Sequence, residues 1–238
     1  MSAYASKVLA VAAAEIGYLE KASNADLDSK TANAGKNNFT KYARDLDAIG
    51  FYNTPKNGYE WCDVFVDWCM VKAFGEAKAR ELLNHGPCGA GCGFSAQYYK
   101  NAGRFHTTDP QLGDQIFFQR NGEICHTGLV ESVSGGVVTT IEGNTSGASG
   151  VISNGGGVCR KYYNVGDNCI YGYGRPNYDI EEEEEMPKYQ TIAEVPDWGK
   201  ATVQKLVDAG ALKGDESGLN LSEDMTRFLV ILDRLGKL

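Results

Sequence analysis

A cysteine suited to nucleophilic chemistry stands at the start of a predicted helix. Phe65, Val66 and Cys69 follow Cys62 by three, four and seven residues. This spacing predicts an amphipathic helix with the thiol on its buried face. At the first turn of a helix, unpaired amides and the helix dipole favour an anion and lower the pKa of a thiol. The sequence therefore predicts a thiolate nucleophile at Cys62, with an inert core cysteine as the alternative. Cys69, about two turns or ~10 Å further on, is expected to be a packing residue.

A thiol nucleophile needs a base, and His126 is the best candidate among the three histidines. The alternation of residues 123–131 predicts a β-strand, and the preceding residues 109–118 predict a turn followed by another strand. His85 and His106 lie in loop-like surroundings and remain alternatives for the base.

An acidic or amide side chain must hold the imidazole of such a base in the correct tautomer. Residues 137–144 are rich in β-branched side chains and predict a strand, whose period of two places Glu142 and Asn144 on the same face. Either side chain could orient His126. A solvated glutamate and a turn asparagine are the alternative interpretation.

The sequence around these residues resembles the CHAP family, the cysteine- and histidine-dependent amidohydrolases and peptidases that cut bacterial peptidoglycan. Four motifs carry the resemblance in the family's order: WCDVFVDWC at 61–69, PQLGDQIFF at 110–118, HTGLV at 126–130 and IEGN at 141–144. The resemblance covers roughly residues 4–178.

The resemblance implies a role for each predicted site residue: nucleophile Cys62, base His126, and orienting groups Glu142 and Asn144. Trp61 and Asp63, on either side of the thiol, are expected to contact the substrate. The implied reaction is hydrolysis of a peptidoglycan amide through an acyl-enzyme, by an N-acetylmuramoyl-L-alanine amidase or an endopeptidase. A transglutaminase-like acyl transferase and a catalytically silent wall-binding protein remain as alternatives.

The fold class implied by the resemblance is α+β and papain-like. N-terminal helices and the Cys62 helix are expected to pack on an antiparallel sheet of five or six strands, from about Asp114 to Tyr173. The apolar residues 8–14 are expected to belong to a helix packed on the catalytic domain. They make a poor signal peptide, because the run is short, with a single Lys7 before it and Glu15 at its end.

Composition restricts the partners of this chain. Its 238 residues, 42% of them hydrophobic, suffice for one full core and a small appendage. The sequence contains no run of about 18 apolar residues, so no membrane span is predicted. The net charge of −8 and the lack of a basic face argue against nucleic acid as a partner. The expected location is synthesis in the cytoplasm without a clear signal peptide, followed by action on the cell wall after release, as by a phage endolysin or a secreted enzyme.

The charge pattern divides the chain into a catalytic domain at 1–179, an acidic linker at 180–187 and a small helical domain at 188–238. The linker holds five consecutive glutamates, which repel each other and extend the chain. The last part resembles a single surface-layer-homology repeat through VPDW at 195–198, AGALKGD at 209–215 and MTR at 225–227. Such repeats attach proteins to cell-wall polymers. The segment is therefore predicted to bind the wall or to form a homo-oligomer, with a packing appendage as the alternative.

No cofactor is predicted. Free thiols are the default in a reducing cytoplasm, while a zinc site or disulfides remain alternatives for Cys88, Cys92, Cys159 and Cys169. A calcium loop is a weaker alternative. Asn24, Asp26 and Asp28 alternate like the start of such a loop, but Gly35 stands where the closing glutamate should be.

Overall fold

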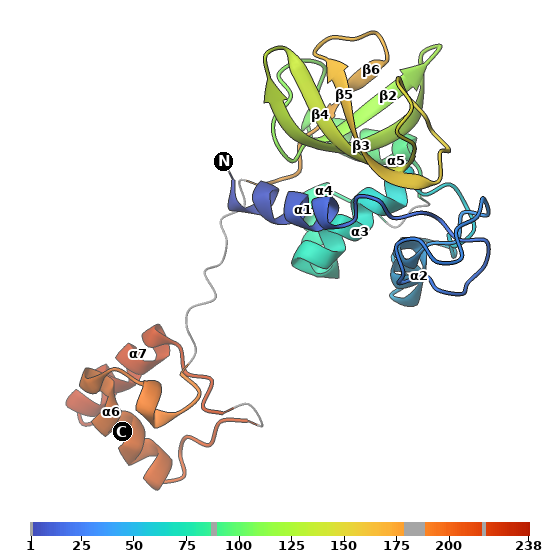
Figure 1. Cartoon of the computed structure of the whole chain (residues 1–238). Helices are drawn as coiled ribbons and strands as arrows, with labels where there is room; N and C mark the ends of the chain where they lie inside the picture. Colours follow the sequence, from blue (N-terminus) through green and yellow to red (C-terminus); the bar gives the residue numbers. More distant parts are fainter. Residues whose placement is uncertain (1, 87–89, 179–188, 216–217) are drawn as a thin grey trace. The chain divides into compact units, whose positions relative to one another are not determined.

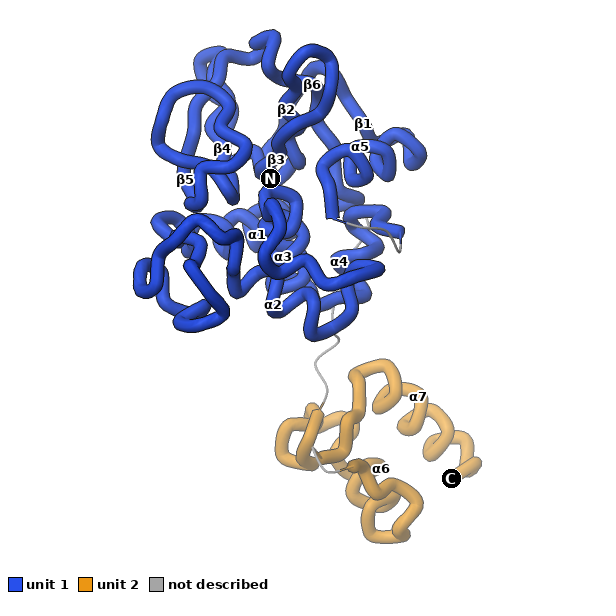
Figure 2. Tube along the Cα trace, turned by 90° about the vertical axis from the view of Figure 1, so that its right-hand side faces the viewer, with its two compact units in different colours: residues 1–179 blue, residues 180–238 orange. Residues whose placement is uncertain are grey.

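The chain folds into two units, residues 1–179 and residues 180–238 (Figures 1 and 2). The computed structural model describes residues 2–86, 90–178, 189–215 and 218–238. The first unit combines helices with an antiparallel sheet, which confirms the predicted α+β class. The whole of the predicted acidic linker, and Cys88, lie outside the described residues.

The helices of the first unit precede most of its sheet: α1 Ala3–Ala14, α2 Lys41–Ala48, α3 Cys62–Phe74, α4 Glu76–Leu83 and α5 Cys92–Asn101. In Figure 1 these helices lie together on one side of the sheet. Helix α1 packs against α3, as expected for the apolar N-terminal segment. The predicted helix start at Cys62 is confirmed.

Helix α3 is buried on nearly all sides, so the predicted amphipathic pattern is wrong. Ten of its 13 residues are buried, including Asp63 and Asp67. The reason is its central place: α1, α2, α4 and α5 surround it, and strands β3 and β4 cover the remaining side. A helix enclosed in this way has no solvent face that would require a polar stripe.

The sheet has six strands in the order β1-β6-β2-β3-β4-β5, and every pair of neighbours is antiparallel. The strands are β1 Phe105–His106, β2 Gln115–Arg120, β3 Glu123–Ser134, β4 Val137–Thr145, β5 Gly157–Asn164 and β6 Ile170–Gly174. The short β1 lies before the predicted start of the sheet at Asp114. The strands of the sheet share an apolar core formed by Ile116, Phe118, Val130, Val138, Tyr163 and Tyr173.

Two glycines allow the close contacts that bring α3 and the strands together. A Cβ atom at Gly143 on β4 would stand 2.5 Å from the Cβ of Phe65 on α3. At Gly128 on β3, a Cβ atom would stand 2.5 Å from the Cγ of Glu142. Side chains at these positions would therefore push the helix from the sheet and displace the glutamate.

The second unit contains η1 Ile192–Glu194, α6 Asp197–Asp208 and α7 Glu223–Arg234. Its small core is formed by Val195, Val203 and Leu221. The sequence Ser222-Glu223-Asp224 predicts a cap and first-turn acids for α7. The cap is confirmed, because the Ser222 side chain accepts a hydrogen bond from the Met225 amide at 3.1 Å. In the parts of the chain that the structure describes, no helix has the length and apolar character needed to cross a membrane.

We expect Gly143→Ala to destabilise the first unit by roughly 1–3 kcal/mol, because the added methyl group overpacks the contact with Phe65. Denaturant unfolding of the full chain measures this change. Gly147→Ala is the matched control, since a Cβ atom there would meet no atom within 4 Å. Equal stability of the two variants would show that the α3–β4 contact tolerates expansion.

Candidate active site

Cys62 is the first residue of α3 and is only 7% exposed. Its pKa is raised well above the ordinary value, first by a hydrogen bond with the thiol of Cys92 and then by burial. The expectation of a lowered pKa is therefore wrong. The helix start alone would favour the thiolate, but desolvation and a neighbouring thiol at the start of α5 favour the neutral form more strongly.

His126 and Glu142 form a buried pair on adjacent strands. The distance from His126 Nε2 to Glu142 Oε2 is 3.0 Å, and both side chains are fully buried. The second carboxylate oxygen, Oε1, accepts a hydrogen bond from the Thr140 hydroxyl at 2.6 Å. Phe118 stacks on the imidazole ring with 5.8 Å between centroids. These contacts fix both the tilt of the ring and the partner of its Nε2 atom.

The other ring nitrogen of His126, Nδ1, is buried and has no hydrogen-bond partner among the described residues. With Nε2–H donating to Glu142, Nδ1 of the neutral ring carries a lone pair and is a proton acceptor. A buried polar atom without a partner is costly. This arrangement therefore holds the imidazole in a fixed orientation and leaves Nδ1 available to accept a proton.

Gln115, at the start of β2, ties the helix start to the histidine strand. Its Nε2 atom donates to Asp63 Oδ1 at 3.0 Å and to Thr127 Oγ1 at 3.1 Å. Asp63 follows Cys62 and Thr127 follows His126, so one amide joins the two segments that carry these residues. Gln115 was not among the site residues predicted from the sequence. The signal that could have indicated it is a polar residue directly before the apolar run 116–118.

Trp61 and Asp63, which were expected to contact substrate, are 0% and 3% exposed. The Trp61 indole N–H donates to Glu20 Oε2 at 3.0 Å. Asp63 Oδ2 accepts hydrogen bonds from the Gly91 amide and the Ser95 hydroxyl, both at 2.9 Å. The two side chains therefore support the helix start from inside the protein instead of lining a substrate surface.

Asn144 lies at an irregularity of the β4–β5 pairing and has a left-handed backbone, with φ of 54°. Its Oδ1 atom accepts a hydrogen bond from the Gly156 amide at 3.2 Å. Its Nδ2 atom is buried and has no partner within the described residues. Of the two predicted orienting groups, Glu142 contacts the imidazole, whereas Asn144 holds the loop between β4 and β5.

The other two histidines lie apart from this pair. His85 Nε2 is 3.7 Å from Asp67 Oδ2, within a ring cluster that includes Phe51. Burial and the nearby Arg80 lower the pKa of His85 to about 4. His106 is on the edge strand β1, where it pairs with Tyr173 of β6.

The remaining cysteines and acidic groups that the structure describes form no cluster of metal-ligand type. The six cysteines that the structure describes are free thiols, and Cys69 is fully buried, as expected for a packing residue. Within the described ranges, no group of three or more histidine, cysteine or acidic side chains could hold a metal ion. Asp28, from the calcium-like pattern, pairs with Arg44 at 2.7 Å.

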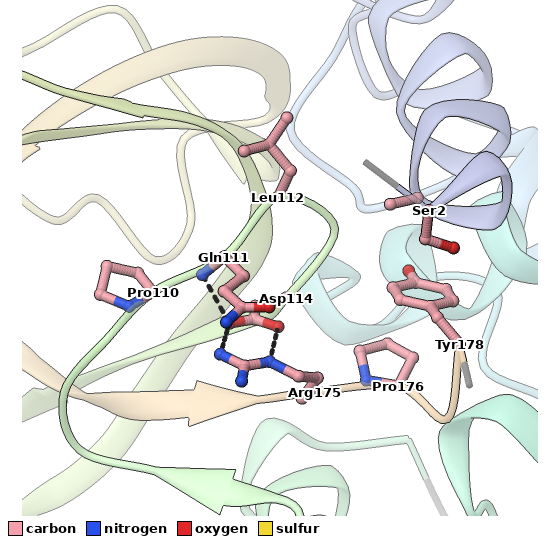
Figure 3. A pocket seen from close by; sticks show the side chains of 9 residues that line it. Ser2, Pro110, Gln111, Leu112, Asp114, Arg175, Pro176 and Tyr178 are labelled. Atoms are coloured by element: carbon pink, nitrogen blue, oxygen red, sulfur yellow. Dashed lines mark hydrogen bonds and ion pairs between the residues drawn. The ribbon is translucent and has the colours of Figure 1, made fainter.

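A cavity of about 420 Å³ lies elsewhere in the first unit, and none of the predicted site residues lines it (Figure 3). Its wall contains an ion pair between Arg175 Nε and Asp114 Oδ1 at 3.0 Å. The Gln111 amide donates to Asp114 Oδ2 at 2.8 Å, which fixes the carboxylate further. The cavity wall is thus held by internal contacts and contains none of the groups described above.

Comparison with protein families gives a match within the first unit. A CHAP domain profile matches residues 54–144, a range that contains Cys62, His126, Glu142 and Asn144. The resemblance to the CHAP family is thereby confirmed, and the match supports a peptidoglycan hydrolase or amidase in general. No curated protein and no solved structure matched the chain.

We expect Cys92→Ala to lower the pKa of Cys62, because the substitution removes the thiol whose hydrogen bond raises it most. More thiolate would then be present at neutral pH. The measurement is the pH dependence of Cys62 alkylation, followed by mass spectrometry of the labelled peptide. Cys125→Ala, which changes another half-buried thiol, is the control. An unchanged alkylation profile in Cys92→Ala would mean that burial alone sets the pKa.

Proposed function

We propose that this chain, which carries a CHAP domain over residues 54–144, cuts an amide bond of bacterial peptidoglycan with Cys62 as its nucleophile. One observation supports the proposal above all. The buried His126–Glu142 pair leaves Nδ1 without a partner on strands that pack against the helix beginning at Cys62. Nucleophilic catalysis by a thiol requires a positioned base, and the strands that carry this pair pack against the helix that begins with the thiol.

In the proposed first step, His126 Nδ1 takes the proton from the Cys62 thiol. Glu142 accepts the Nε2–H hydrogen bond and stabilises the resulting imidazolium. The sulfur then attacks the carbonyl carbon of the amide, and a C–S bond forms as the carbonyl oxygen becomes an anion. Backbone amides at the start of α3, including that of Cys62, are suited to hold this oxyanion.

Collapse of the tetrahedral intermediate breaks the C–N bond, and the proton on Nδ1 passes to the departing amine. The acyl group remains on Cys62 as a thioester. A water molecule then attacks the thioester carbon while His126 takes a proton from it. Release of the carboxylic acid returns the sulfur to its thiol form, so the cycle consumes one water molecule and no other reactant.

The raised pKa of Cys62 gives His126 a larger part in this mechanism. Burial and Cys92 keep the thiol neutral at rest. The thiolate therefore forms by transfer of the proton to Nδ1 within the site, where the imidazolium offsets the new negative charge. We propose that water, and not an amine, is the normal acceptor of the acyl group. Product analysis with added amine separates this reaction from acyl transfer.

We further propose that the second unit attaches the enzyme to the cell wall. Helix α7 carries exposed apolar side chains, of which Phe228 is 60% and Ile231 54% exposed. An open groove of about 390 Å³ beside them is lined by Trp198 together with Arg227 and Arg234. Aromatic and cationic groups together suit an anionic sugar polymer. Self-association through the apolar face would add avidity. We propose that the enzyme acts on the wall after release from the cytoplasm, as an endolysin or a secreted enzyme.

We expect Cys62→Ala to abolish the release of new amino and carboxyl groups from purified walls. His126→Ala should lower kcat by a factor of about 10²–10⁴, the usual contribution of a general base. Turbidity of wall suspensions and mass spectrometry of the fragments measure both effects. Cys69→Ala is the control, because that thiol is buried on the same helix but lies seven residues beyond the helix start. Retained activity in Cys62→Ala would contradict the proposed nucleophile.

A chain that ends at residue 178 should cut a small soluble wall peptide at the full rate, because the proposed site lies within the first unit. It should lose co-sedimentation with whole walls, and its lytic rate on cells should fall. Sedimentation and lysis assays compare it with the full chain, and light scattering reports the oligomeric state of each. Equal wall binding by both chains would contradict the attachment role.

A further inference from the structure

A second cavity, of about 470 Å³, lies between two segments that are hydrogen-bonded to residues near the proposed active site. One wall comes from the N-terminal segment through Glu20 and Lys36, and the other from the β4–β5 loop through Ser146, Asn154 and Gly156. It therefore lies between a loop of the helical part and a loop of the sheet.

Both walls of this cavity are bonded to residues of the site. Glu20 Oε2 accepts the indole N–H of Trp61, the residue before Cys62. On the other side, the Gly156 amide donates to Asn144 Oδ1, two residues after the glutamate that orients His126. The cavity is therefore connected on both sides to the chain segments that carry the proposed nucleophile and the orienting glutamate.

The Glu20 carboxylate is buried, at 3% exposure, yet no described residue forms an ion pair with it. Its Oε2 atom accepts a hydrogen bond from the neutral indole of Trp61. The neighbouring Lys21 is engaged elsewhere, because its Nζ donates to the Lys30 carbonyl at 3.1 Å and lies over the Tyr18 ring. A buried carboxylate without a counter-charge is costly, so this one is suited to a cationic ligand.

Gly156 leaves this carboxylate uncovered. Its backbone is left-handed, with φ of +75°, and a Cβ atom there would stand 3.2 Å from the Glu20 Cδ. Any larger residue would therefore crowd the carboxylate from the side of the loop. Lys36, the cation on the cavity wall, is exposed and forms no ion pair with Glu20 in the described parts of the chain.

We propose that Glu20 forms a subsite for a free ammonium group of the peptidoglycan peptide, beside the amide that Cys62 attacks. This inference rests on the proposed function. The ammonium group supplies the charge that the buried carboxylate lacks, and the low dielectric of the cavity strengthens the pair. The enzyme would thereby select wall peptides that carry an unmodified amine near the scissile bond.

The test measures binding in the full chain with Cys62→Ala, so that no ligand is consumed. The ligands are a wall-peptide fragment with a free amine and the same fragment with that amine acetylated. By calorimetry, we expect the free amine to bind roughly tenfold more tightly, a modest value for one charge-assisted contact. Adding Glu20→Gln should abolish this preference without weakening the binding of the acetylated fragment. The glutamine oxygen still accepts the Trp61 N–H, so the variant removes the charge and keeps the bond.

Lys36→Met is the matched control, because it removes a positive charge from the cavity wall, whereas Glu20→Gln removes a negative charge. It should therefore leave the binding of the free amine unchanged or make it tighter. Equal affinities for the two fragments before Glu20→Gln would overturn the proposal. An equal loss for both fragments after Glu20→Gln would also overturn it, because it would show a structural role. If the fragments bind as expected but the wild-type chain cuts neither, the hydrolase proposal fails while the ammonium subsite stands.

Discussion

The arrangement of the candidate site depends on the buried carboxylate of Asp63. It accepts hydrogen bonds from Gly91 and Ser95 at the start of α5 and from Gln115 at the start of β2. Gln115 extends the same network to Thr127 on β3. A carboxylate buried without such donors would be strongly destabilising, so these bonds are required once α3 enters the core. One side chain thereby fixes the helix start against both another helix and the sheet.

Burial also determines how the proposed chemistry is controlled. Cys62 has a raised pKa, and both side chains of the His126–Glu142 pair are fully buried. The reactive charges would therefore form only when a proton moves from sulfur to nitrogen. The same physical rule draws attention to Glu20, a buried carboxylate without a described counter-ion. A buried polar or charged side chain without a partner raises the free energy of the free protein, and a substrate that supplied the partner would lower it.

Local patterns in the sequence predicted the elements well and their surroundings poorly. The start of α3 at Cys62, the antiparallel pairing and the Ser222 cap are confirmed, because each depends on residues a few positions apart. The amphipathic pattern expected for α3 is wrong, because the side expected to be polar meets other helices. The lowered pKa expected for Cys62 is wrong for the same reason, since the helix dipole is a local effect and burial beside Cys92 is not.

The sequence by itself determined which residues are the candidates for the proposed chemistry: the motifs around Cys62, His126 and Glu142 resemble the CHAP family, and the CHAP match covers them. Only the tertiary structure decided how they are held. The bonds of Asp63 to Gly91 and Gln115 join residues 28 and 52 positions apart, and the Trp61–Glu20 bond joins residues 41 positions apart. Periodicity describes neighbours along one helix or strand. Contacts across such separations depend on how elements pack, so burial, counter-charges and pKa values follow from the folded arrangement.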